Sequence, residues 1–96
     1  MKIQHEEKGE TGRHYINDEQ GNTIGEITYK VGADKVLTID HTGVNDDMQG
    51  KNIGQDLVRA VVEQARAEGK KIHPVCTFAK AVIERNAEFR DVLANV

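Results

Sequence analysis

The stretch from residue 46 to residue 57, "DDMQGKNIGQDL", could bind an anion. It joins a strand-like run to a helix-like run, and a helix N-terminus presents backbone N–H groups that lack intrahelical partners. Gly50 and Gly54 give the backbone conformational freedom, and Asn52 tolerates the left-handed region better than most residues. Spacing alone allows either a phosphate-binding loop or an ordinary helix start. Gly54 is costly within a first helical turn, so close approach of a ligand to the backbone would explain it.

Two further side chains could take part in chemistry. His41 ends a strand-like run and can exchange protons near pH 7, although it could equally pack against the sheet. Cys76, the only cysteine, precedes a helical run that could lower its thiol pKa, but free cysteines often act as small buried hydrophobes. The other histidines show no metal-ligand spacing and are expected at the surface: His5, His14 and His73. The sequence therefore predicts no metal site.

The elements that must position these groups change character at mid-chain. The first half contains β-like runs separated by turns, and it predicts an antiparallel meander over residues 1–7, 12–18, 23–31 and 35–44. Strict alternation over 35–44 would place Leu37, Ile39 and His41 on one face of the sheet.

The second half has helical periodicity. An apolar stripe runs through residues 52–69 and ends at Gly69, a natural helix terminator. Residues 71–76 form a short strand, which a right-handed crossover would place parallel to 35–44. Helical turns follow, with Phe78, Val82, Phe89 and Val92 available to cover the sheet. The predicted fold is α+β, a single domain over 1–96 in which the meander leads into one βαβ unit.

Composition excludes several classes of function. The chain has 96 residues, a net charge of −3 and 38% hydrophobic residues, which indicates a globular domain without the basic surface that nucleic-acid binding needs. No apolar run approaches the length of a membrane span, and the N-terminus lacks the apolar segment of a signal peptide. We therefore expect a cytoplasmic protein that binds neither membrane nor nucleic acid.

The loop and its surroundings resemble the coenzyme-A-binding segment of the GCN5-related N-acetyltransferases (GNAT). That signature reads Gln or Arg, two residues, Gly, one residue, then Gly or Ala, and residues 49–54, "QGKNIG", match it except that Asn52 replaces the first glycine. The whole chain is similar to small single-domain GNAT-like proteins, which carry "HT-x-V" before the loop and "P-x-C-x-F" after it. These segments are His41–Val44 and Pro74–Phe78 here.

The resemblance implies a minimal GNAT-like fold that binds acetyl-CoA. Backbone amides around Gly50 to Gln55 would hold the pyrophosphate, the pantetheine arm would follow the strand ending at Val44, and the acetyl group would lie near His41 and Cys76. The implied cofactor-binding residues are Val44, Gln49, Gly50, Lys51, Asn52, Ile53, Gly54 and Gln55. Only residues 6–12 separate the first two predicted strands, where larger GNAT enzymes insert helices that build an acceptor pocket.

Three hypotheses follow from this resemblance. The first is an acetyl-CoA-dependent N-acetyltransferase, with Cys76 and His41 as candidate catalytic residues. The second is a non-catalytic acyl-CoA-binding or sensor module, and the third is a structural interaction domain. In the first, the acceptor amine attacks acetyl-CoA directly or through an acetyl-cysteine at Cys76. The identity of the amine acceptor and the oligomeric state stay open.

Overall fold

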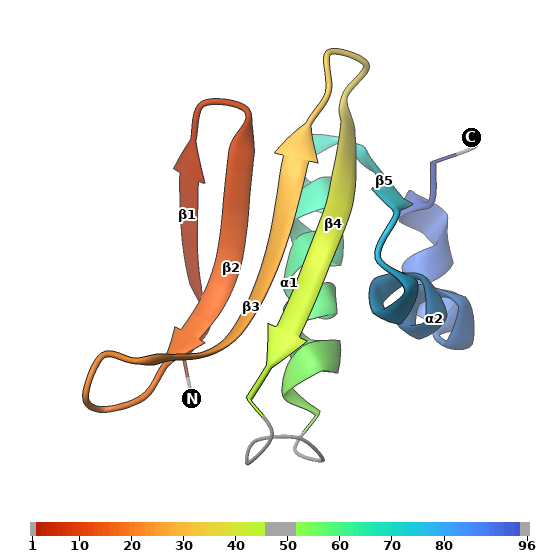
Figure 1. Ribbon diagram of the computed structural model, residues 1–96. Helices are drawn as coiled ribbons and strands as arrows, with labels where there is room; N and C mark the ends of the chain where they lie inside the picture. The colour runs from red at the N-terminus through yellow and green to blue at the C-terminus, as the bar shows by residue number, and fades with distance from the viewer. Residues whose placement is uncertain (1, 46–51, 95–96) are drawn as a thin grey trace.

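The computed structural model describes residues 2–45 and 52–94 and confirms the α+β prediction. A five-stranded sheet has the order β1-β2-β3-β4-β5, with helices packed against it (Figure 1). The strands are β1 (Gln4–Lys8), β2 (Thr11–Asn17), β3 (Thr23–Val31), β4 (Val36–Val44) and β5 (Lys71–Pro74). The helices are α1 (Ile53–Glu68), α2 (Thr77–Arg85) and the 3₁₀ helix η2 (Ala87–Val92). Strands β1 to β4 pair antiparallel, and β5 pairs parallel with β4, as the predicted βαβ unit requires.

Helix α1 supplies much of the core. It lies behind β3 and β4 in the view of Figure 1, and its predicted apolar stripe is confirmed. The buried residues of this helix are Ile53, Gly54, Leu57, Val58, Val61, Val62 and Ala65. They belong to one cluster with sheet residues such as Ile27, Leu37 and Ile39. The helix ends where Gly69 adopts the left-handed conformation and the N–H of Lys70 reaches the carbonyl of Ala65, 2.8 Å away.

The C-terminal segment packs beside α1 and pairs with β5 through a single β-bridge. Val82, Ile83, Phe89 and Val92 are buried, and Leu93 forms an isolated parallel bridge with Ile72 of β5. Phe78 departs from the prediction that it covers the sheet, because 42% of it stays exposed. It lies in the first turn of α2, where its ring meets α1 instead.

A polar cluster joins the N-terminal hairpin to the rest of the core. His14, which the sequence placed at the surface, is only 6% exposed and donates from Nε2 to Gln64 Oε1 at 2.8 Å. Its ring stacks on His5 with centroids 4.1 Å apart. The hydroxyl of Tyr29 donates to Glu7 at 2.8 Å, accepts from Gln64 at 3.1 Å and lies 2.6 Å from His5 Nε2. Burial is therefore possible for His14 because α1 supplies its partner.

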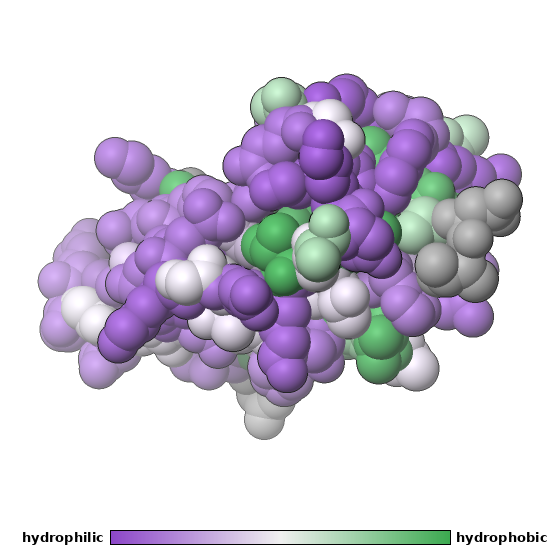
Figure 2. Space-filling model, turned by 90° about the horizontal axis from the view of Figure 1, so that it is seen from above, coloured by the Kyte–Doolittle hydropathy of each residue, from purple (hydrophilic) through white to green (hydrophobic). Residues whose placement is uncertain are grey.

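The surface is largely hydrophilic. Figure 2, which views the molecule from above, shows apolar atoms only in small groups among polar ones. Within residues 2–45 and 52–94, no helix is long and apolar enough to cross a membrane.

Candidate functional site

Strands β4 and β5 separate half-way along β4. They pair only from Val36 to Ile39, where β5 ends at Pro74. The N–H groups of Val75 and Cys76 then both donate to the carbonyl of Ile39, at 3.0 and 3.1 Å. In the described part of the chain, β4 continues from residue 40 to residue 44 without a strand partner on this side. A strand edge that lacks a strand partner can pair with an extended ligand.

A β-bulge at Asp40 decides which way His41 faces. Tyr29 of β3 pairs with Ile39 and Thr28 pairs with His41, so Asp40 has no partner in the ladder. Opposite residues of an antiparallel pair share a face, and therefore His41 lies with Thr28 on the face away from α1. The expectation that Leu37, Ile39 and His41 share one face is wrong, because strict alternation does not allow for the extra residue. His41 is exposed.

Cys76 lies beside the β4 edge, near the face of the sheet opposite to that of His41. It is the N-cap residue of α2, partly buried, with Sγ 3.5 Å from Oγ1 of Thr42. Thr42 pairs with Ile27 and shares its face, which is the face toward α1. The structure thus brings Cys76 to Thr42 and places His41 on the opposite face. Sequence reasoning missed Thr42, although it belongs to the "HT-x-V" segment.

The surroundings of Cys76 favour its thiolate. Burial raises the pKa of the thiol, but the hydroxyl of Thr42 and the backbone amides of Ala79, Phe78 and Thr42 outweigh it and lower the pKa below the usual value. Cys76 is also the N-cap residue of α2, where the helix dipole favours negative charge on the sulfur. A nucleophilic or proton-donating role for this thiol is chemically accessible.

The first turn of α1 has the geometry expected of an anion site. Asn52, its N-cap residue, is left-handed at φ 60° and ψ 20°, the conformation that asparagine tolerates better than most residues. Its side chain makes no capping hydrogen bond, so it does not occupy the first-turn amides. Ile53 and Gly54 are buried and Gln55 is half-buried. The remaining predicted loop residues, Gln49, Gly50 and Lys51, lie outside the described residues.

A ring of the protein itself lies against Gly54. A Cβ atom added there would come within 2.6 Å of Cζ of Phe78, so a larger residue would displace the ring. An aromatic neighbour within the chain therefore lies where a side chain at this position would project, in addition to the ligand approach that the sequence suggested. Val44, the last predicted binding residue, is half-buried and packs against the core at the end of β4.

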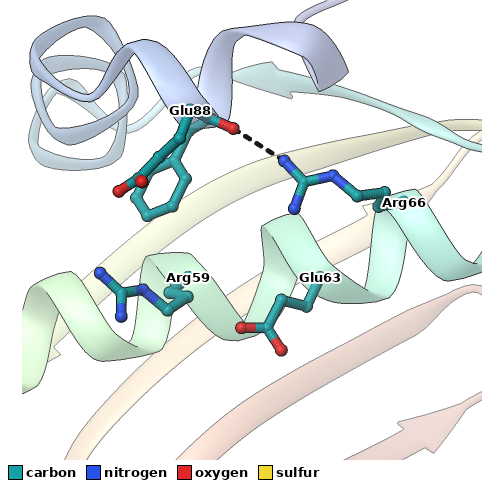
Figure 3. Close-up of a pocket in the computed structure, with 5 residues that line it drawn as sticks. Arg59, Glu63, Arg66 and Glu88 are labelled. Carbon is teal, nitrogen blue, oxygen red and sulfur yellow. Dashed lines mark hydrogen bonds between the residues drawn. The ribbon is translucent and has the colours of Figure 1, made fainter.

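A separate hollow of the surface lies between α1 and η2 (Figure 3). Arg66 donates from Nη2 to the carbonyl of Glu88 and to the carboxylate of Asp91, at 2.8 and 2.7 Å, and the guanidinium of Arg59 lies 5.5 Å from the ring centroid of Phe89. These contacts attach η2 to α1. None of the residues that line the hollow was predicted from the sequence to belong to the site.

The residues described include no group of three or more histidine, cysteine, aspartate or glutamate side chains that could hold a metal ion.

Comparisons with known proteins agree with this geometry. Residues 13–92 match the family model described as GCN5-related N-acetyl-transferase. A GCN5-like protein of Staphylococcus aureus, assigned as an N-acetyltransferase and solved by NMR, is 35% identical with a TM-score of 0.75, over 97% of this chain and 89% of that one. A comparison with curated proteins finds no match.

More distant structures share the fold. A Bacillus anthracis protein assigned as a streptothricin acetyltransferase was solved with acetyl coenzyme A. It is 16% identical with a TM-score of 0.59, over 70% of this chain and 39% of that one. A ribosomal-protein-alanine N-acetyltransferase of Brucella melitensis is also 16% identical, with a TM-score of 0.64 over 91% and 65% of the two chains. With its splayed β4 and β5 and its left-handed helix start, the chain belongs to the GCN5-related N-acetyltransferase family.

Proposed function

We propose that this protein binds acetyl-CoA between the first turn of α1, the free edge of β4 and the N-terminus of α2, and transfers the acetyl group to an amine. The observation that carries the proposal is the separation of β4 from β5 at Ile39, with a thiol of lowered pKa at the point of separation. Family membership supports the donor, because the related Bacillus anthracis protein was solved with acetyl coenzyme A.

Each part of the site would bind one part of the donor. The backbone amides of the first turn of α1, from Ile53 to Gln55, suit the pyrophosphate, since a helix N-terminus favours negative charge. Gln49, Gly50 and Lys51 would complete this phosphate site. The unpaired edge of β4 as far as Val44 would exchange hydrogen bonds with the amides of the pantetheine arm, as an added strand does.

The two candidate catalytic residues would act on different partners. His41, on the face away from α1, would accept the proton that the acceptor amine loses as its nitrogen attacks the thioester carbonyl carbon. When the tetrahedral intermediate collapses, the C–S bond breaks and the coenzyme A thiolate leaves. In this direct route, Cys76 would give its proton to that thiolate.

A second route passes through the protein. The Cys76 thiolate attacks the thioester and coenzyme A thiolate leaves. The amine then attacks the acetyl-cysteine, gives its proton to His41 and releases the Cys76 thiolate. Both routes begin with the same bound donor, and both use the lowered thiol pKa. Mass spectrometry after exposure to acetyl-CoA separates them, because only the second route leaves an acetyl group on Cys76.

The site leaves room for a large acceptor. The turn between β1 and β2 contains only residues 9–10, and Figure 1 shows no helix across the front of β1 to β4. The face that carries Thr28 and His41 is therefore open to an exposed amine on another protein as well as to a small molecule.

The test has two stages. Titration calorimetry with acetyl-CoA measures binding, and release of free coenzyme A thiol is then followed with small amines, polyamines and lysine-containing peptides. His41→Ala and Cys76→Ala should keep donor binding and lose turnover at least about tenfold. A wild-type chain that shows no binding to millimolar acetyl-CoA would refute the proposal. Binding without release of coenzyme A for any acceptor would instead support an acyl-CoA-binding module.

A further inference from the structure

Two large apolar side chains are exposed in the described parts of the chain, and they flank Cys76. Val75 is 57% exposed and Phe78 is 42% exposed. The other apolar residues of α2 behave differently, because Val82 and Ile83 are almost completely buried. Exposed apolar side chains on both sides of Cys76 in the sequence, on a largely hydrophilic surface, favour a place where an apolar ligand group binds.

Phe78 spans the distance between two parts of the site. Its backbone lies two residues beyond Cys76, at the N-terminus of α2, while its ring meets the backbone of Gly54 in the first turn of α1. The position of a Cβ at Gly54 would be 2.6 Å from Cζ and 2.9 Å from Cε2, so the end of the ring lies directly against this turn. One face of the site therefore consists of an aromatic ring between the helix amides and the thiol.

We infer that Phe78 is a positioning residue for the acyl-CoA donor, which holds the arm between the phosphates and the thioester. The inference rests on the proposed function, since it assumes that the phosphates bind at the first turn of α1. An arm that runs from this turn to Cys76 has to cross the exposed part of the ring. The ring limits where the arm can lie, and thereby places the thioester carbonyl beside Thr42 and Cys76.

A role for the Phe78 ring in donor binding would account both for the glycine at position 54 and for the partial exposure of the ring. A side chain that only filled space between α1 and α2 would be buried like its neighbours Val82 and Ile83. Phe78 instead keeps contact with Gly54 at its tip and leaves much of its surface free. Binding of the donor arm would cover this surface, which is the usual behaviour of an aromatic wall in a ligand site.

The test compares two probes that share the phosphates but not the arm. Acetyl-CoA carries the arm and the thioester, whereas 3′-phosphoadenosine 5′-diphosphate carries neither. Phe78→Ala should weaken acetyl-CoA binding about tenfold or more by calorimetry, and should change binding of the 5′-diphosphate less than about twofold. Lys80→Ala, an exposed change on the same helix, is the matched control and should alter neither. Circular dichroism and urea denaturation establish that each variant is folded.

A second variant disturbs the ring without removing it. Gly54→Ala places a methyl group 2.6 Å from Cζ of Phe78, which displaces the ring, and should therefore weaken acetyl-CoA binding when Phe78 is present. In the Phe78→Ala background the methyl group has room, and the same change should have little further effect. Coupling between the two positions shows that the ring is the element displaced.

Distinct results overturn distinct statements. If folded Phe78→Ala binds acetyl-CoA as tightly as the wild type, or if both probes weaken equally, Phe78 does not position the arm, while the proposed function stands. If Phe78→Ala does not fold, Phe78→Leu is measured with the same two probes and the same criteria. A wild-type chain that binds neither probe overturns the proposed function and this inference with it.

Discussion

Tertiary packing decides whether replacing Gly12 by alanine stabilises or destabilises the protein. It lies within β2, opposite Tyr29 of β3, and its backbone does not adopt a positive φ. Replacing an interior strand glycine by alanine ordinarily stabilises a protein by about 0.5–1 kcal/mol, because alanine loses less conformational freedom on folding. In this structure an added Cβ would overlap Cζ and the hydroxyl of Tyr29 and come within 2.9 Å of Cε1.

The ring of Tyr29 has little freedom to move away. It is buried, and its hydroxyl contacts His5, Glu7 and Gln64. Overpacking of this kind costs about 1–3 kcal/mol, and each hydrogen bond lost as the hydroxyl shifts costs about 0.5–1.5 kcal/mol. After subtracting the gain in strand propensity, we expect Gly12→Ala to lower the free energy of unfolding by about 1–3 kcal/mol.

The effect is large for a chain of this size. The whole domain should be stable by only about 5–14 kcal/mol, and each kcal/mol corresponds to roughly 4–8 °C in melting temperature. Urea denaturation followed by circular dichroism measures the change. The control is Gly12→Ala in a Tyr29→Leu background, where the shorter side chain leaves space and the penalty should disappear. A Gly12→Ala protein as stable as the wild type, or more stable, would refute the packing argument.

Three further predictions follow from single groups. Burial lowers the pKa of His14 below 6.5, so as the pH falls the unfolded state binds a proton at a higher pH than the folded state does. The contribution of His14 to stability should therefore be complete above pH 6.5 and decrease as the pH falls below that value. Urea denaturation of His14→Gln should show a weaker loss of stability over the same pH range. The pKa of the Cys76 thiol is lowered, so alkylation by iodoacetamide should reach half its maximal rate below pH 9. Thr42→Val removes the hydroxyl that contacts the sulfur and should move that midpoint to higher pH. An unchanged midpoint would show that the hydroxyl does not lower the thiol pKa. Left-handed Asn52 should tolerate glycine and lose about 1–2 kcal/mol on replacement by valine, so equal denaturation midpoints for the two variants would contradict its conformation.

Several parts of the site could be predicted because they depend on local sequence. The "QGKNIG" signature before an apolar helix placed the left-handed residue at Asn52, and Gly69 marked the end of α1. The parallel pairing of β5 with β4 followed from the crossover through α1. These features depend on backbone conformation and helical period, which neighbouring residues determine.

The orientation of the candidate catalytic groups could not be predicted in the same way. One extra residue at Asp40 turns His41 to the face away from α1, and only the pairing of β4 with β3 reveals it. Phe78 was expected over the sheet but meets Gly54, because the position of α2 beside α1 brings the two together. Neither pairing register nor helix position is encoded in the periodicity of a single segment.

The sequence by itself therefore determined the elements, their order, the family and the helix start at which the donor is proposed to bind. The tertiary structure decided that His14 is buried against Gln64, that Cys76 meets Thr42, and that His41 faces the uncovered side of the sheet. The physical reason is the same in each case. Period and propensity act over a few residues, whereas these contacts join segments between 34 and 50 positions apart, or depend on one strand's register against another.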